Sequence, residues 1–148
     1  MNVKNDTRDL YKPLIILDSS ILIKFFAKEQ GDEPGTSRLV NDMNNRRVKI
    51  AILPLMYWEI GNWVCRDFSH MATEVLSAIM LCDFEEHVLD MSIMNLTVDI
   101  TREHRKVTFY DASYHALAIT TGGLFVTNDK AYYKAAHKLG HIKLLRDY

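Results

Sequence analysis

Cysteine is scarce in this sequence: Cys65 and Cys82 are the only two among 148 residues. Two cysteines cannot build a disulfide framework, and neither lies in a Cys/His spacing that would hold zinc. This usage is typical of a protein from the reducing cytoplasm. A chain of this length is expected to form one domain whose core needs neither disulfides nor a structural metal.

Long hydrophobic runs are missing as well. The longest, residues 50–58, covers nine residues and contains Pro54, whereas a helix that spans a bilayer needs roughly 20. The first 12 residues mix acids and bases without an apolar stretch, so they do not resemble a signal peptide. We therefore expect no membrane segment, a short polar lead-in over residues 1–13, and a single domain over residues 14–148.

An excess of one charge is also absent, because 18 basic and 19 acidic residues give a net charge of -1. Any contact with nucleic acid must then use local patches. Residues 102–106 hold three bases and one acid, and the series Lys130, Lys134 and Lys138 recurs every four residues. Each patch is a solvated helix face or a contact for RNA phosphates. Residues 74–103 hold seven acids and one base, and that side should repel RNA.

Short apolar runs alternate with helical patterns along the chain. The run at residues 14–17 (LIIL) stops at Asp18, as expected for a strand buried on both faces of a parallel sheet. Further strands are predicted at residues 48–53, 87–91, 123–127 and 141–145. Capping signals predict helices over residues 19–26, 36–47, 54–67, 69–83, 92–106, 111–121 and 128–140, with Gly122 and Gly123 forming a turn. This alternation predicts an α/β fold, a three-layer α/β/α sandwich with a mainly parallel five-stranded sheet.

Four acids stand near the carboxyl ends of the predicted strands, where reactive groups gather in open sheets. They are Asp18 after the first strand, Glu59 in the helix after the second, Asp111 at the start of the helix before the fourth, and Asp129 after the fourth. Converging carboxylates repel one another and raise one another's pKa values unless a cation neutralises them. Hard oxygen ligands favour Mg²⁺ or Mn²⁺.

Each acid also has a simpler interpretation when it is considered alone. An Asp at a strand-to-helix junction is most often a helix N-cap, which applies to Asp18, Asp111 and Asp129. Glu59 shares a helix face with Asn62 and Arg66, a pattern that also fits a surface stripe.

The segments that carry these acids are similar to those of one family. They read LIILDSSILIKFF, MYWEIGNWV, FYDASYHALA and VTNDKAYYKAA, the last containing a Thr-x-Asp element at Thr127. In order, spacing and flanking residues the chain resembles a PIN domain, and specifically the VapC-type ribonuclease toxins of bacterial and archaeal toxin–antitoxin pairs. The resemblance covers roughly residues 14–146.

The resemblance implies Mg²⁺-dependent endonucleolytic cleavage of RNA by a toxin that an antitoxin protein controls. Asp18 and Asp111 would be central metal ligands, with Glu59 and Asp129 as direct or water-mediated ligands, and Mn²⁺ could substitute for Mg²⁺. The family also implies a homodimer. Residues 50–81 hold more apolar side chains than one face of each helix needs for its own core. This excess also favours a homodimer.

Residues beside the acids have assignable roles. Ser20 and Thr127 are expected to hydrogen-bond to ligand carboxylates or waters, or to act as ordinary caps. Tyr114 matches the family pattern, whereas His115 is expected to be a packed or surface histidine and not a catalytic base.

Three alternative assignments fit the sequence less well. Haloacid-dehalogenase phosphatases require an acid two residues after the first Asp, where this chain has Ser20. A receiver domain requires paired acids before its phospho-accepting Asp, and these are missing. A catalytically degenerate PIN domain, acting only as an RNA-binding or assembly module, is disfavoured because all four acids are present.

Overall fold

The computed structural model describes residues 12–27 and 34–148, so most of the predicted lead-in lies outside the described residues. The helices and strands are β1 (Leu14–Leu17), α1 (Ser19–Ala27), α2 (Pro34–Asn44), β2 (Lys49–Ile52), α3 (Leu55–Asp67), α4 (Ala72–Met80), β3 (Glu85–Glu86), α5 (Met91–Glu103), α6 (Phe109–Thr121), β4 (Leu124–Thr127), α7 (Lys130–Ala136) and β5 (Ile142–Leu144). Short 3₁₀ turns follow three of them, at η2 (Ser69–Met71), η3 (His137–Leu139) and η4 (Leu145–Asp147).

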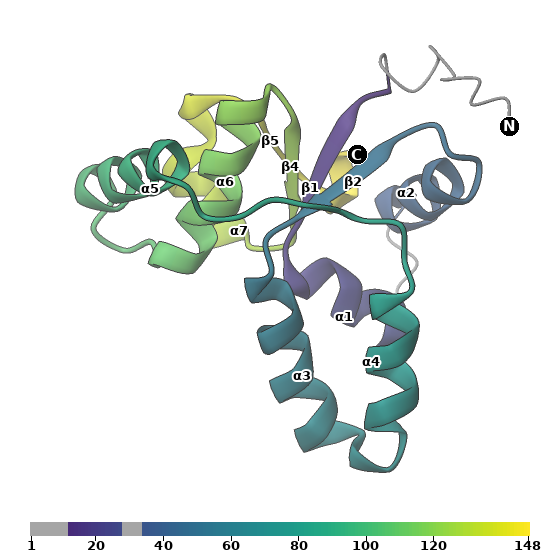
Figure 1. Ribbon diagram of the computed structural model, residues 1–148. Coiled ribbons are helices and arrows are strands. Elements are labelled where there is room, and N and C mark those ends of the chain that lie inside the picture. The colour runs from purple at the N-terminus through teal and green to yellow at the C-terminus, as the bar shows by residue number, and fades with distance from the viewer. Residues whose placement is uncertain (1–11, 28–33) are drawn as a thin grey trace, which may run out of the picture.

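The five strands form one sheet in the order β3-β2-β1-β4-β5 (Figure 1). Every neighbouring pair is parallel, which confirms the predicted sheet. The chain builds one half of the sheet from β1 to β3 and then returns to the middle to add β4 and β5. The strand order therefore reverses between β1 and β4, and ligand sites of open α/β sheets lie at the carboxyl ends of strands at such a point.

Two hydrophobic cores cover the two faces of the sheet. Alternate residues of a strand point to opposite faces, so Ile16 packs with α5, α6 and α7, whereas Ile15 and Leu17 pack with α1 to α4. Figure 1 shows α5, α6 and α7 on one side of the strands, and α3 and α4 as an adjacent pair that projects from the other. The predicted three-layer sandwich is thus confirmed.

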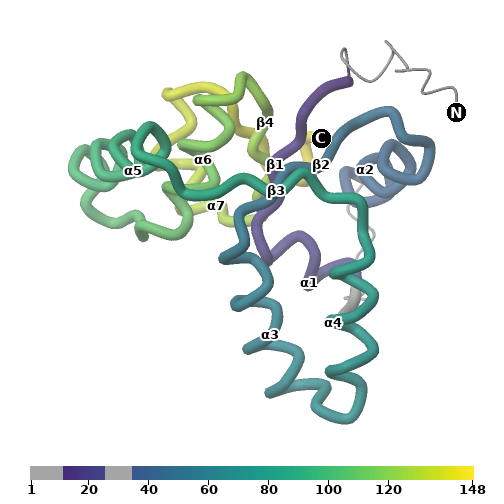
Figure 2. Tube along the Cα trace, viewed as in Figure 1, coloured from purple at the N-terminus to yellow at the C-terminus, as the bar shows by residue number. Residues whose placement is uncertain are grey.

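The prediction for the third strand was wrong. It placed the strand at residues 87–91, but β3 is the two-residue segment Glu85–Glu86 on the sheet edge. The Asp90 side chain accepts a hydrogen bond from the backbone N–H of Ile93 and caps α5, which ends the extended segment. Figure 2 shows this segment running from α4 to α5 across the sheet. Both side chains of β3 are exposed, so no apolar pattern marked it.

Several helices begin at residues other than those predicted, two of them because a side chain caps the helix. Thr108 caps α6, so this helix begins at Phe109 and not at Asp111. Asp129 caps α7, which begins at Lys130 and not at residue 128. The helix predicted from residue 36 begins at Pro34. Gly122 ends α6 with a φ of 71°, which confirms the predicted turn.

Two expectations from composition concern cysteines and membranes. Cys65 and Cys82 are free and exposed, as the count predicted. Within residues 12–27 and 34–148, no helix combines the length and the apolar character that crossing a bilayer requires.

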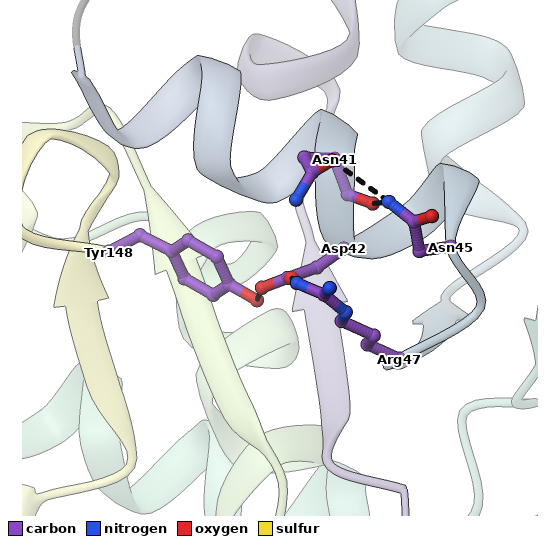
Figure 3. Close-up of polar contacts among 5 residues, drawn as sticks. All are labelled: Asn41, Asp42, Asn45, Arg47 and Tyr148. Carbon is purple, nitrogen blue, oxygen red and sulfur yellow. Dashed lines mark hydrogen bonds and ion pairs between the residues drawn. The ribbon is translucent and has the colours of Figure 1, made fainter.

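The carboxyl end of the chain is held against α2 (Figure 3). The Tyr148 hydroxyl donates to Asp42 Oδ2 at 3.2 Å, and Arg47 lies 3.5 Å from the other oxygen of Asp42. Asn45 donates from Nδ2 to the carbonyl and side-chain oxygens of Asn41, which closes the last turn of α2. Burial and Asp42 together raise the pKa of Tyr148 to about 12, so the hydroxyl remains a donor at neutral pH.

A second contact between α2 and the end of the chain requires a glycine at the start of α2. A Cβ built on Gly35 would lie 1.5 Å from the carbonyl oxygen of Leu145, so only a residue without a side chain lets α2 approach η4. Gly61, inside α3, has no atom within 4 Å of a built Cβ. The two positions form a matched pair.

We predict that Gly35→Ala lowers the free energy of unfolding by at least about 3 kcal/mol, because backbone must move to relieve the overlap. Gly61→Ala should raise it by about 0.5 to 1 kcal/mol, because alanine has the higher helix propensity. Urea denaturation monitored by circular dichroism measures both values. Equal effects of the two substitutions would contradict the close approach of α2 to η4.

Candidate functional site

A cleft of about 270 Å³ opens at the carboxyl ends of β1 and β4, where the strand order reverses. Its lining residues are Asp18, Ser19, Ser20, Glu59, Asp111, Tyr114, Asn128 and Asp129. All four acids singled out in the sequence are among them, and we call them the four cleft acids. They come from the β1–α1 junction, α3, α6 and the β4–α7 junction, so segments far apart in the sequence meet here.

Asp18 is the most deeply placed of the four, with 5% of its surface exposed. Its Oδ1 accepts hydrogen bonds from the Ser20 hydroxyl and, at 3.2 Å, from the backbone N–H of Ile21. Its Oδ2 accepts one from the Thr127 hydroxyl at 2.7 Å. Burial raises the pKa of Asp18 to about 6, because the loss of hydration outweighs these three hydrogen bonds, and the nearby charge of Asp111 adds to the rise.

Thr127 connects the two central strands at the cleft. The sheet register pairs Leu17 with Val126, so the residues that follow, Asp18 and Thr127, lie side by side. The Thr127 hydroxyl donates to Asp18 and accepts from the backbone N–H of Asp129 at 3.0 Å. One buried hydroxyl therefore links the carboxylate of Asp18 to the backbone of Asp129.

Glu59 enters the cleft from α3 and is held by Tyr114 of α6. The Tyr114 hydroxyl donates to Glu59 Oε2 at 2.8 Å. Tyr114 is 1% exposed, and its burial together with the Glu59 charge raises the pKa of the hydroxyl far above its ordinary value, so it remains a donor. Glu59 is therefore not part of a surface stripe, because it lines the cleft and accepts from Tyr114, whereas Arg66 pairs with Asp67 at 2.9 and 3.0 Å.

Asp111 occupies the third position of α6 and forms a reciprocal cap with Thr108. The Thr108 hydroxyl donates to Asp111 Oδ2 at 2.6 Å and accepts from the Asp111 backbone N–H at 3.1 Å. Partial burial raises the pKa of Asp111, and the charge of Asp129 adds to the rise, whereas the Thr108 hydrogen bond opposes it. The carboxylates of Asp111 and Asp129 are therefore close enough to repel each other.

Asp129 caps α7 through one oxygen only. Its Oδ1 accepts from the backbone N–H groups of Ala131 at 2.7 Å and Tyr132 at 2.8 Å. Its Oδ2 has no hydrogen-bond donor among the described residues. Capping and lining the cleft are therefore compatible for this residue.

His115 is a packing residue, as the sequence suggested. It is fully buried, with Nε2 2.7 Å from the Gly140 carbonyl and Nδ1 3.0 Å from the Tyr132 hydroxyl. A carbonyl can only accept, so Nε2 carries the proton and Nδ1 accepts from Tyr132. Burial lowers the pKa of His115, so the ring is neutral and ties α6 to α7.

Two lining residues, Ser19 and Asn128, were not identified from the sequence as part of the site. Each directly follows or precedes a cleft acid at the carboxyl end of a strand. That adjacency was the available signal, but serine and asparagine are so common at helix starts that it carried no specificity.

The chemistry of the donor set fits a hard divalent cation, because the cleft offers four carboxylates and the hydroxyl of Ser20. Within the described ranges, no three His, Cys, Asp or Glu side chains lie close enough together to hold a metal ion directly. Mg²⁺ commonly binds through one or two carboxylates and keeps several waters, so direct contact with three protein ligands is not required.

Comparison with protein-family models matches residues 15–138 to the PIN domain. No curated protein matches the sequence. The fold is similar to a toxin–antitoxin complex from Klebsiella pneumoniae, with a TM-score of 0.66 and 16% identity over 88% of this chain and 97% of that one.

Two further solved structures have the same fold. VapBC2 from Rickettsia felis, bound to a DNA fragment from its promoter, matches with a TM-score of 0.65 and 17% identity, covering 88% of this chain and 96% of that one. PAE2754 from Pyrobaculum aerophilum matches with a TM-score of 0.64 and 24% identity, covering 91% of each chain.

The raised pKa of Asp18 predicts how stability depends on pH when metal is removed. An acid with a raised folded-state pKa binds more protons in the folded state, so stability falls as pH rises from 3.8 to about 6. Between pH 4 and pH 7 in EDTA, we expect the free energy of unfolding of wild type to fall by roughly 2 kcal/mol more than that of Asp18→Asn. Urea denaturation at pH 4 and pH 7 measures the difference.

Asp99→Asn is the control, because the Asp99 side chain is 65% exposed on α5 and should leave the wild-type profile unchanged. Identical pH profiles for wild type and Asp18→Asn would show that the Asp18 carboxyl does not carry this raised pKa.

Proposed function

Since the chain belongs to the PIN domain family, we propose that it is a Mg²⁺-dependent endoribonuclease, with Mn²⁺ as a substitute. The observation that carries the proposal is the convergence of the four cleft acids from four separate segments into one cleft. Capping accounts for the positions of Asp18 and Asp129 at the starts of α1 and α7, but it does not account for a fourth carboxylate, Glu59, in the same cleft, because grouped carboxylates repel one another. A cation that all four attract accounts for it.

We assign Asp18 and Asp111 as central metal ligands, and Glu59 and Asp129 as direct or water-mediated ligands. When bound, Mg²⁺ would polarise the phosphodiester and offset the negative charge that develops during its hydrolysis. Among the four cleft acids, Asp111 Oδ1, Asp129 Oδ2 and Glu59 Oε1 are the carboxylate oxygens that receive no hydrogen bond from the described residues, so they are open to a cation or its waters.

The neighbouring residues hold these ligands in place. Thr127 and Ser20 orient the Asp18 carboxylate through both of its oxygens, and Tyr114 fixes Glu59 across the cleft. Such supporting hydrogen bonds reduce the motion of a ligand and tune its basicity. The cleft is therefore shaped for a cation before one binds.

We propose further that the enzyme is a toxin controlled by an antitoxin protein, and that it forms a homodimer. Two of the similar structures are described as toxin–antitoxin or VapBC assemblies. The chain also exposes large apolar side chains that its own core does not use: Trp58, Met80, Leu81, Val88 and Met91 are each at least 64% exposed. Surfaces of this kind favour contact with another protein.

We predict cleavage of unpaired RNA in Mg²⁺ and no cleavage in EDTA. Asp111→Asn should lower kcat by at least 100-fold, because it removes a charge from the ligand set. It should also lose most of the rise in Tm that saturating Mg²⁺ gives wild type through mass action. Gel assays of labelled RNA and thermal scans with and without Mg²⁺ test the two expectations separately.

Asp147→Asn serves as the control, because the Asp147 side chain is 56% exposed on η4, away from the cleft acids. RNA cleavage that persists in EDTA would refute the metal-dependent mechanism. A normal Mg²⁺ response without cleavage of any RNA would instead indicate the degenerate module.

For the dimer, sedimentation velocity at tens of micromolar should give twice the mass of one chain. Leu81→Glu should weaken the dimer, because Leu81 is 86% exposed and a buried charge without a partner opposes association. A wild-type protein that stays monomeric at this concentration would contradict the homodimer and leave the catalytic proposal intact.

A further inference from the structure

Two exposed aromatic side chains stand directly before Asp111, on the first turn of α6. Phe109 is 39% exposed and Tyr110 is 56% exposed. Neither ring packs against another aromatic ring in the part of the chain that the structure describes. They precede Asp111 by two residues and one residue, at the end of α6 that contributes Asp111 to the cleft.

Basic residues precede the aromatic pair. Arg105 and Lys106 are exposed in the turn between α5 and α6 and form no ion pair with an acid of the described ranges. Arg102, one turn earlier, lies 3.8 Å from Asp99 and is therefore partly neutralised. Two uncompensated positive charges thus lie immediately beside two exposed rings and next to a cleft acid.

The connection that carries these groups is short and internally bonded. The backbone N–H of Val107 donates to the His104 carbonyl at 2.9 Å, and that of Ala112 donates to the Thr108 carbonyl at 3.1 Å. Val107 packs against the core beneath α5 and α6. The charges and rings are therefore held on a short, hydrogen-bonded turn and on the first turn of α6.

We propose that residues 105–110 form a nucleotide-binding subsite for unpaired nucleic acid. Tyr110 and Phe109 stack on bases while Arg105 and Lys106 bind the adjoining phosphates. Aromatic faces beside cations are the combination that holds single strands, and the faces of bases are free to stack on a protein only where the strand is unpaired. The inference rests on the proposed nuclease function and identifies the surface that guides the strand to the acids.

The test measures binding apart from cleavage, in the Asp18→Asn background with Mg²⁺ present. Fluorescence anisotropy with a labelled 12-nucleotide unpaired RNA should show that Tyr110→Ala raises Kd about 10-fold. Binding of the same sequence as a duplex should change less than 2-fold. Tyr110→Phe should bind as well as the parent, because stacking needs the ring and not the hydroxyl.

Substitution of the two basic residues should change the salt dependence of RNA binding as well as its affinity. Arg105→Gln with Lys106→Gln should weaken binding and reduce the slope of log Kd against log salt by about 1.4, the value for two phosphate contacts on a single strand. Tyr110→Ala should leave this slope unchanged. Lys143→Gln and Leu139→Ala, exposed residues of β5 and η3, are the matched controls and should alter neither Kd nor slope.

The outcomes separate the two proposals. If wild type cleaves RNA but Tyr110→Ala binds unpaired RNA with unchanged affinity, or loses affinity for duplex equally, the subsite is refuted and the nuclease stands. If wild type cleaves no RNA but binding of unpaired RNA depends on Tyr110, the subsite stands and the nuclease is refuted. Thermal scans of each variant confirm that the protein is folded.

Discussion

The hydrogen bond from Thr127 to Asp18 joins the carboxyl ends of the two strands between which the sheet order reverses. It places a carboxylate in a nearly water-free position, where an ionised group is costly unless it is well partnered. Three donors partner Asp18, and burial still raises its pKa to about 6. Part of the free-energy cost of ionising the buried Asp18 carboxyl therefore remains in the folded protein, and a cation bound in the cleft would offset that cost.

Helix capping and site formation use the same side chains here. Asp18 accepts from the N–H of Ile21 at the start of α1, and Asp129 accepts from two N–H groups at the start of α7. In a parallel sheet each strand leads into a helix, so a capping acid already lies at the carboxyl end of a strand. Capping engages one oxygen of Asp129 and leaves the other without a donor among the described residues, so this side chain both caps α7 and lines the cleft.

The proposed functions use surfaces of different chemistry. The segment at residues 105–110, which leads to Asp111, carries exposed cations and exposed rings. The segment at residues 80–91 instead combines exposed apolar side chains with four acids, Asp83, Glu85, Glu86 and Asp90. Phosphates would be repelled by the second surface and attracted to the first. Substrate binding and protein association therefore need not compete for the same residues.

The sequence by itself determined four of the five strands and the four acids that meet in the cleft. Runs such as LIIL are apolar on both faces and stop at a polar residue, which is a local property that folding preserves. The sequence missed β3, because two exposed acids on an edge strand carry no hydrophobic pattern. It also placed the starts of α6 and α7 imprecisely, because the capping side chains of Thr108 and Asp129 decide them, through one and two hydrogen bonds respectively.

Only the tertiary structure decided how the acids are held and which neighbours matter. The choice between a surface stripe and a site for Glu59 depended on Tyr114, which lies 55 residues away and reaches it from another helix. The partnership of Thr127 with Asp18 spans 109 residues and follows from strand register. Periodicity and spacing report on contacts within a few residues, whereas these contacts arise when separate elements pack, so no local pattern could contain them.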